Sequence, residues 1–231
     1  MANAVRAKQL LGREAAAALP EDSVLGIGSG STVAAFIDAL GERMREKPFS
    51  CLAVAASESS ARLAEGAGLR VVPLETVATI DFAVDGADAV DVHGTLIKGG
   101  GAALVRERLI IAVAQQSLIL VDDSKPMTTF ENVTIPLAVI PFGWSNTRSR
   151  LQREAAAVTL RLAGESPKLT DDGLYILDAQ FDVIEDAGAL HRRLKLIDGV
   201  VDTGLFVGYR PVVWVSDGQR VWTMEEAARI D

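Results

Sequence analysis

The sequence predicts an α/β protein, with a parallel sheet covered by helices on both faces and a smaller α+β part. Over residues 1–130, short and continuously apolar strand candidates alternate with helices, which is typical of a parallel sheet buried on both faces. After about residue 130 the order becomes strand, helix, strand, helix, strand without glycine-rich crossovers, which indicates a compact α+β insert. We therefore expect one domain formed by residues 1–130 and 206–231, and a smaller domain formed by residues 131–205.

The first part begins with a helix over residues 4–18, where good helix formers carry apolar residues at helical spacing. The apolar segment 23–27 is the first strand candidate, and residues 33–45 continue as a helix that is apolar on one side. The further elements follow from apolar runs, polar helix starts and glycine stops. They are a strand at 51–55, a helix at 57–65, strands at 71–72 and 82–84, a helix from Gly99 to about Gln115 and a strand at 117–121.

In the second part, residues 133–140 have β character. One helix is expected over residues 146–163, because four apolar residues share a helical face: Leu151, Ala155, Val158 and Leu162. The remaining expected elements are a strand at 174–177, a helix near 186–195, and apolar strands at 199–207 and 212–215.

Composition excludes several classes of protein. Lys and Arg number 23 against 31 Asp and Glu, and the net charge of −8 lacks the cationic surface that nucleic-acid binding requires. With 49% hydrophobic residues and eight prolines, the chain is not wholly disordered. We expect a core of substantial size and no nucleic-acid partner.

The cysteine and histidine counts limit the redox and metal chemistry. The single cysteine, Cys51, excludes an intramolecular disulfide and a multi-cysteine zinc site. His93 and His191 lie too far apart to form a local ligand cluster, so carboxylate-held magnesium is the metal site that stays open. Charged residues in the N-terminal segment interrupt the apolar core that a signal peptide would need. No uncharged apolar run approaches the roughly 18 residues of a membrane helix. We expect a cytoplasmic protein without a membrane partner.

A glycine-rich turn, Gly26-Ile-Gly-Ser-Gly-Ser-Thr32, connects the first strand to the next helix. Glycines let the backbone approach a ligand, and the helix start offers N–H groups and the positive end of the helix dipole. Ser31 and Thr32 add hydroxyl donors, so the turn suits a phosphate group. It lacks the lysine of a P-loop and is a poor dinucleotide-binding turn. A tight turn with a serine N-cap is the alternative.

Asp85-Gly-Ala-Asp88 directly follows the strand candidate at 82–84. The carboxyl ends of parallel strands are where α/β sheets bind ligands. Two carboxylates held close together can share a proton, which supplies a proton donor or acceptor. The alternative is a loop stabilised by Asx turns.

Lys98-Gly-Gly-Gly101 precedes a helix that contains Glu107. Three consecutive glycines are a costly way to build a surface loop, and they are expected where backbone contacts a ligand. Glu107 lies on the apolar stripe of the helix, between Leu104 and Ile111, where a buried carboxylate is costly. Such a carboxylate is suited to the role of general base. The alternative is a glutamate at the edge of the stripe with its carboxylate in water.

Asp122-Asp-Ser-Lys125 follows the strand at 117–121, where Lys125 can neutralise a phosphate or a sugar hydroxylate. An ordinary polar loop is the alternative, and Cys51 and His93 are interpreted as structural or incidental. Because the motifs follow strands of one sheet, we expect them to converge at its carboxyl edge. Together they indicate a small phosphorylated substrate that undergoes proton transfer.

In combination, these segments resemble the ribose-5-phosphate isomerases of type A. The segments Gly26–Thr32, Asp85–Ala89, Lys98–Arg108 and Asp122–Lys125 match motifs of that family in order, and further similarity covers residues 136–141, 170–173 and 199–206. The resemblance implies a Rossmann-like parallel-sheet domain with a smaller ferredoxin-like α+β insert, and a homodimer. It also implies reversible isomerisation of D-ribose 5-phosphate and D-ribulose 5-phosphate in the non-oxidative pentose phosphate pathway, with no metal or organic cofactor.

The resemblance also assigns roles to individual residues. Glu107 is implied as the base that moves a proton between C2 and C1 through a cis-enediolate. Asp85, Asp88 and Lys98 are implied to bind the sugar hydroxyls, assist ring opening and stabilise the enediolate. The implied substrate-binding residues are Lys8, Ser29, Gly30, Ser31, Thr32, Asp85, Gly86, Ala87, Asp88, Lys98, Gly99, Gly100, Gly101 and Lys125.

The chain departs from the family pattern in mild ways. Ser29 replaces a threonine and keeps the hydroxyl, Ala89 replaces a glutamate, and Arg108 replaces a lysine. The residues leave two other functions open. One is a CoA transferase, in which a glutamate attacks a thioester. The other is a sugar-phosphate sensor domain, which needs the phosphate-binding turn but no base.

Overall fold

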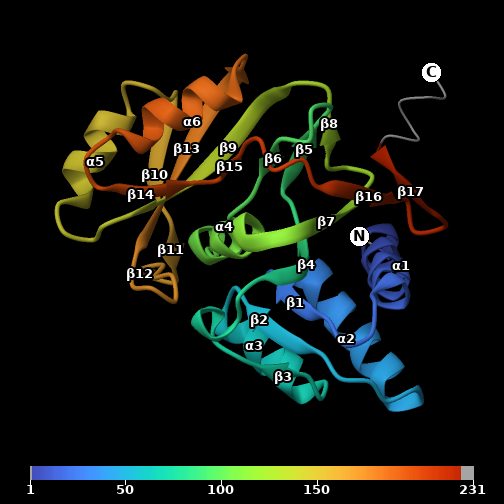
Figure 1. Ribbon diagram of the computed structural model, residues 1–231. Helices are drawn as coiled ribbons and strands as arrows, with labels where there is room; N and C mark the ends of the chain where they lie inside the picture. The colour runs from blue at the N-terminus through green and yellow to red at the C-terminus, as the bar shows by residue number, and fades with distance from the viewer. Residues whose placement is uncertain (1, 225–231) are drawn as a thin grey trace. The chain divides into compact units, whose positions relative to one another are not determined.

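The computed structural model describes residues 2–224, which form two compact units (Figure 1). The first unit contains the chain up to Ala87, Arg106–Pro126 and the chain from Arg210; the second contains Asp88–Val105 and Met127–Tyr209. The domain limits expected from the sequence stay a prediction, and residues 225–231 of the expected range 206–231 lie outside the described residues. The contacts differ from that expectation mainly at 88–105, because β6 (Leu96–Ile97) of this segment pairs with β15 (Leu205–Phe206) of the second unit.

The first unit is built on a seven-stranded sheet with the order β17-β16-β7-β4-β1-β2-β3. All neighbours are parallel except β16 and β17, as the continuous apolar strands predict. The chain runs outward from β1 through β2 to β3, and then from β4 through β7 to β16 on the other side. This is the Rossmann-like order, and it places the topological switch point between β1 and β4. The strands are β1 Val24–Ile27, β2 Leu52–Ala55, β3 Arg70–Val71, β4 Ile80–Gly86, β7 Ala114–Asp122, β16 Val212–Ser216 and β17 Val221–Thr223.

Alternation along β1 decides which helix covers which face of this sheet. Leu25 and Ile27 are fully buried in a core with Phe36 of α2. Gly26 points to the opposite face, where a Cβ would lie 2.4 Å from the Ile110 side chain of α4. A glycine therefore permits α4 to pack closely over β1. The helices of this unit are α1 Ala2–Ala18, α2 Ser31–Glu46, α3 Glu58–Gly66, the 3-10 helix η1 Leu74–Thr76 and, from Arg106 onward, α4 Leu104–Val113.

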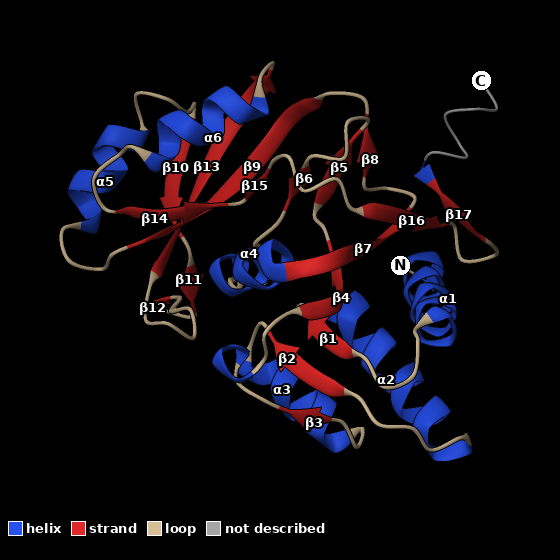
Figure 2. Ribbon diagram, in the orientation of Figure 1, coloured by secondary structure: helices blue, strands red, loops and turns tan. Residues whose placement is uncertain are grey.

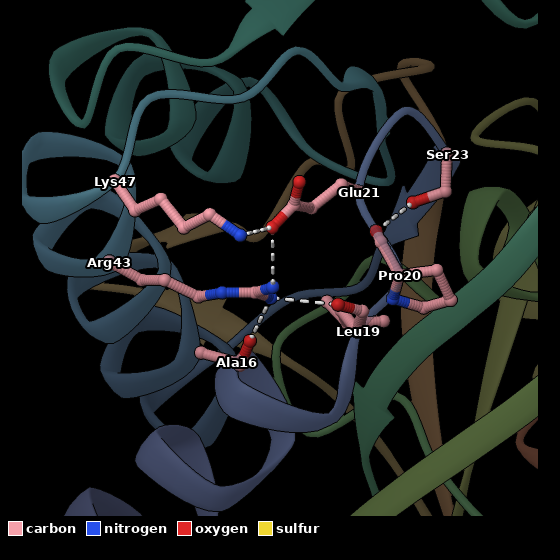
Figure 3. Close-up of polar contacts among 7 residues, drawn as sticks. All are labelled: Ala16, Leu19, Pro20, Glu21, Ser23, Arg43 and Lys47. Carbon is pink, nitrogen blue, oxygen red and sulfur yellow. Dashed lines mark hydrogen bonds and ion pairs between the residues drawn. The ribbon is translucent and has the colours of Figure 1, made fainter.

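The C-terminal ends of α1 and α2 are joined by a charged cluster (Figure 3). Arg43 of α2 donates from Nη1 to the carbonyl oxygens of Ala16 and Leu19, each at 2.7 Å. Ala16 lies in the last turn of α1 and Leu19 directly follows Ala18, the last residue of α1, so neither carbonyl has an N–H donor further along the helix. Glu21 Oε1 accepts a hydrogen bond from the Lys47 ammonium at 2.7 Å and lies 3.8 Å from Nη2 of Arg43. Arg43 thus acts as a C-terminal cap for the neighbouring helix.

The second unit contains a four-stranded antiparallel sheet with the order β10-β13-β9-β14. Its chain order is strand, helix, strand, strand, helix, strand, which is the ferredoxin-like arrangement (Figure 2). Both helices pack on the face that carries Ile135 and Leu137 of β9. The elements are β9 Phe130–Val139, α5 Trp144–Leu151, β10 Ala157–Leu160, β13 Tyr175–Ile184, α6 Ala187–Lys195 and β14 Val200–Thr203. Short strands complete the list: β5 Ala89–Asp91, β6 Leu96–Ile97, β8 Pro126–Met127, β11 Leu162–Ala163, β12 Ser166–Pro167 and β15 Leu205–Phe206.

The single helix expected over residues 146–163 is wrong. Helix α5 ends at Leu151, and residues 157–160 form β10. The apolar residues of this stretch also fit alternation, because Val158 is buried opposite Ala179 of β13 while its neighbours in β10 are more exposed. The expected strand at 199–207 is interrupted at Gly204, whose N–H donates to the Pro136 carbonyl at 2.6 Å.

Candidate active site

The turn after β1 has the backbone geometry of an anion site. Gly30 is the N-cap of α2 and has a φ of +90°, a conformation that favours glycine. Its carbonyl accepts the Ala34 N–H at 3.0 Å, so α2 begins directly behind it. The N–H groups of the first helical turn therefore face outward at the positive end of the α2 dipole. This turn can bind a phosphate with backbone donors alone.

Lys8 of α1 lies beside this helix start. Its Nζ donates to the Ser31 hydroxyl at 2.9 Å, although 23 positions separate the two residues. Both line a cavity of about 600 Å³ along α1 and α2. The Lys8 ammonium thus lies next to the turn that is expected to bind phosphate.

Asp85 is the buried acid at the end of β4. It is 2% exposed, and its Oδ1 accepts the N–H groups of Gly86 at 2.7 Å and Ser29 at 3.3 Å. A Cβ at Gly28 would lie 1.9 Å from the Asp85 carboxyl carbon, so a side chain at that position would displace the acid. The position of Asp85 therefore requires glycine at position 28.

Glu107 lies in the first turn of α4 and is 3% exposed. Its burial agrees with the position on the apolar stripe. Its Oε1 accepts the Ser29 hydroxyl at 2.6 Å. The Ser29 N–H also donates to Asp85. Ser29, which follows β1, therefore contacts both acids: Asp85 at the end of β4 and Glu107 on α4. The serine hydroxyl points to the acid rather than to the phosphate turn, which the sequence did not indicate.

Three further expected residues lie at the same edge of this sheet. A Cβ at Gly86 would be 3.7 Å from Thr32, so the end of β4 lies against the start of α2. Lys125 follows β7, and its N–H donates to the Asp122 carbonyl at 3.1 Å. Because β7 pairs in parallel with β4, Lys125 also follows the carboxyl end of a central strand.

Asp88, Lys98 and the three glycines belong to the second unit and form their own group. The Gly100 N–H donates to Asp88 Oδ2 at 2.8 Å. Lys98 is 3% exposed, its N–H donates to the Gly204 carbonyl, and its Nζ lies 5.7 Å from the centroid of the Phe206 ring. Lys98 is thus held at both its backbone and its side chain, the latter by a cation–π contact. Ala87 connects this group to Asp85 and Gly86 through the chain.

The glycine loop also contacts a residue that the sequence does not indicate, Arg161, which is itself paired with Asp178. Arg161 donates to the carbonyl oxygens of Gly99 and Gly100, and it forms an ion pair with Asp178. Arg161 was expected near the end of a helix that does not exist, so no spacing pointed from it to residue 99. The contact is between residues more than 60 positions apart, and only the strand pairing brings them together.

No helix among residues 2–224 is long and apolar enough to cross a membrane. In the same range, no three His, Cys, Asp or Glu side chains are grouped so as to hold a metal ion.

Comparison with known proteins decides the family. The family model for ribose 5-phosphate isomerase A (phosphoriboisomerase A) matches residues 52–220. This chain belongs to that family. A relative named ribose-5-phosphate isomerase A 1 from Oceanobacillus iheyensis is 37% identical over 215 residues, which cover 93% of this chain and 96% of the relative. Ribose-5-phosphate isomerase A from Bartonella bacilliformis is 39% identical over 225 residues, covering 94% and 96%.

Solved structures of the ribose 5-phosphate isomerase family share the whole fold. The enzyme from Methanocaldococcus jannaschii matches with a TM-score of 0.88 and 32% identity, covering 94% of this chain and 97% of the other. A D-ribose-5-phosphate isomerase in complex with phospho-erythronic acid matches with a TM-score of 0.88 and 33% identity, covering 94% and 96%. The family and the α/β fold expected from the motifs are therefore confirmed.

Proposed function

We propose that this chain is a ribose-5-phosphate isomerase, which interconverts D-ribose 5-phosphate and D-ribulose 5-phosphate. The observation that carries the proposal is the buried Glu107, held by Ser29 at the switch point of a chain that belongs to this family. The relatives named for this activity align over more than nine-tenths of the chain, which supports the same reaction here.

The proposed mechanism is proton transfer between adjacent carbons. After ring opening exposes the C1 aldehyde, the Glu107 carboxylate removes the proton from C2. The electron pair of the C2–H bond forms the C1–C2 double bond of a cis-enediolate, and the carbonyl electrons move onto O1. Glu107 then returns the proton to C1, the double bond re-forms between C2 and O2, and the O2 proton passes to O1. A buried carboxylate fixed by a hydrogen bond is suited to both proton transfers.

Lys98, Asp85 and Asp88 are proposed to manage the charge on the sugar oxygens. An ammonium held in place stabilises an enediolate without reorganisation during the reaction. The carboxylates can accept sugar hydroxyls and help to open the ring. Burial of Lys98 and Asp85 supports these roles, because such groups are costly to bury unless they are paired or used in chemistry.

The phosphate is proposed to bind the turn Gly28–Thr32 at the start of α2, with the Lys8 ammonium beside it and Lys125 as a further cation. Backbone donors fixed before substrate arrives support this assignment. Gly86, Ala87 and the Gly99–Gly101 loop are proposed to line the sugar. We further propose that the protein works as a homodimer in the pentose phosphate pathway, as the family resemblance implies, and that it is located in the cytoplasm.

The test is conversion of ribose 5-phosphate by the wild-type protein in EDTA. Formation of ribulose 5-phosphate at a rate that scales with protein concentration is expected. Transfer of CoA from an acyl-CoA, with a trapped glutamyl-CoA adduct, would support the transferase reading instead. Tight ribose 5-phosphate binding without turnover would support a sensor domain.

A further inference from the structure

An arginine–aspartate pair of the second unit is joined to the glycine loop. Arg161 lies between β10 and β11, and Asp178 lies on β13. Arg161 Nε donates to Asp178 Oδ2 at 2.8 Å, and its Nη2 donates to Oδ1. The side chains are only about one-fifth exposed, at 20% and 21%. Two parallel bonds between the planar groups fix the direction of the guanidinium, which a single contact would not do.

The remaining nitrogen of the fork, Nη1, reaches the loop backbone. It donates to the Gly99 carbonyl at 2.8 Å and to the Gly100 carbonyl at 2.9 Å. The arginine backbone is tied as well, because its N–H donates to the Ile176 carbonyl at 2.9 Å. The loop is therefore attached to the antiparallel sheet through one well-oriented side chain.

These bonds determine where the loop N–H groups point. In a trans peptide the carbonyl and the N–H point in opposite directions, and the described chain contains no cis peptide. Arg161 draws the carbonyls of Gly99 and Gly100 to one side, so the N–H groups of Gly100 and Gly101 are directed to the other. The Gly100 N–H lies on the Asp88 carboxylate at 2.8 Å, which agrees with this orientation.

Within the loop, the Ala102 N–H donates to the Gly99 carbonyl at 3.0 Å, but the glycine residues themselves restrict the backbone little. Three successive glycines have the widest backbone freedom of any residues, and fixing each costs conformational free energy. Gly99 has a φ of +101° and Ala102 a φ of +66°, so two residues of the turn have positive φ values, which non-glycine residues rarely adopt. Holding two carbonyls from one rigid group selects a single arrangement.

We propose that Arg161, oriented by Asp178, is a positioning residue that fixes the Gly99–Gly101 backbone and the Asp88 carboxylate for isomerisation. The inference rests on the proposed function, because it assigns the loop and Asp88 to that reaction. Arg161 acts through the loop and not on the substrate. Its loss therefore lowers the rate of the chemical step more than it weakens binding of the phosphate end, which is held elsewhere in the chain. Small misplacements of catalytic groups cost about a hundredfold in rate.

The test compares kcat and KM for ribose 5-phosphate in four proteins: wild type, Arg161→Met, Arg161→Lys and Arg150→Met. Arg150→Met is the matched control, because Arg150 forms an exposed ion pair with Asp198 in the same unit. For Arg161→Met we expect kcat to fall about thirtyfold to a hundredfold with KM within about threefold. Arg161→Lys keeps the charge without the fork, and its kcat should fall about tenfold. The control should keep wild-type kcat.

A second measurement reports on the loop itself. Amide hydrogen exchange at Gly100 should become at least about tenfold faster in Arg161→Met and in Arg161→Lys, with melting temperatures within a few degrees of wild type. If the Arg161–Asp178 pair served only to stabilise the fold, its loss would lower the melting temperature and would not lower kcat selectively over KM. Arg161→Lys, which keeps size and charge, decides the matter if Arg161→Met does not fold.

The outcomes separate the two proposals. Wild-type protein without turnover overturns the proposed function and this inference with it. Wild-type turnover with unchanged kcat in folded Arg161→Lys overturns the inference alone. Equal losses in the Arg150→Met control would also overturn it, because the effect would then belong to any ion pair of this unit.

Discussion

Ser29 Oγ donates to Glu107 Oε1 at 2.6 Å, across 78 positions of the chain. The same serine donates its N–H to Asp85 at 3.3 Å. One small residue in the turn after β1 therefore orients an acid from β4 and an acid from α4. This is how a glycine-rich turn, which the sequence presents as a phosphate site, also organises the proposed base.

Removal of the Ser29 hydroxyl should lower kcat without abolishing substrate binding. A hydrogen bond to a charged group contributes about 1.5–3 kcal/mol, so kcat of Ser29→Ala is expected to fall at least about tenfold. Ser29→Thr keeps the hydroxyl and should stay within about threefold of wild type. Steady-state kinetics on ribose 5-phosphate gives both numbers. If Ser29→Ala keeps full kcat, the serine has no positioning role.

Gly30→Val should separate phosphate recognition from sugar recognition. Gly30 has a positive φ that valine rarely adopts, so the substitution should strain the turn and shift its backbone N–H donors at the start of α2. The ratio of kcat/KM for ribose 5-phosphate to that for ribose should fall at least about tenfold, because the turn helps only the phosphorylated sugar.

The matched control for that experiment is Gly143→Val. Gly143 is also a helix N-cap with a left-handed φ and with open space around it, but it begins α5. Gly143 has αL backbone angles (φ 71°, ψ 17°), where a side chain is strained less than at Gly30 (φ 90°, ψ −178°). Gly143→Val therefore controls for a valine at a helix N-cap, and it should leave the ratio between the two sugars unchanged. An unchanged ratio in folded Gly30→Val would place the phosphate elsewhere.

Arg43→Met should destabilise the fold without touching the proposed site. The substitution leaves two carbonyls at the end of α1 without their charged donor, which costs about 1–3 kcal/mol of unfolding free energy. Lys47→Met is the control, because Lys47 shares the partner Glu21 but is exposed, and its loss should cost about 0.5 kcal/mol or less. Urea titration measures both. Equal and small losses would mean that the cluster in Figure 3 is not a cap.

Cys51 should be protected from alkylation by its burial. Desolvation raises the pKa of the Cys51 thiol above its usual 9.0, against the opposing effect of the Arg43 cation. The folded protein then holds less thiolate than the unfolded chain at pH 8, and the excess of thiolate in the unfolded chain lowers folding stability as pH rises above about 9. Iodoacetamide should react at least about tenfold more slowly in buffer than in urea at pH 8. Similar rates in the two conditions would show that Cys51 is accessible.

Much of the fold follows from local patterns. Apolar runs such as 24–27 and 118–121, alternating with helices, are typical of strands in a sheet that is covered on both faces, so the parallel sheet is predictable. Burial of Glu107 is predictable in the same way, from its place on an apolar helix stripe. The motifs after β1 and β4 lie at strand ends, where the chain leaves the core and polar groups become available.

The rest depends on pairing between distant segments. Residues 157–160 satisfy both helical and alternating patterns, and only the pairing with β13 decides for a strand. The Arg161 contact with Gly99 is a product of that pairing and has no signal in the spacing. The serine hydroxyl likewise has two chemically reasonable partners, a phosphate and a carboxylate, and the three-dimensional fold selects the carboxylate.

The central claim is that Glu107 is the base, and Glu107→Gln tests it most directly. The amide keeps the shape of the side chain but cannot take the C2 proton, so kcat should fall at least about a hundredfold. Binding of ribose 5-phosphate, measured by calorimetry, should stay within about tenfold of wild type. Glu65→Gln, an exposed carboxylate on α3, is the control and should keep full activity. Residual turnover of Glu107→Gln above a few per cent of wild type, in a variant that binds the sugar phosphate normally, would contradict the account.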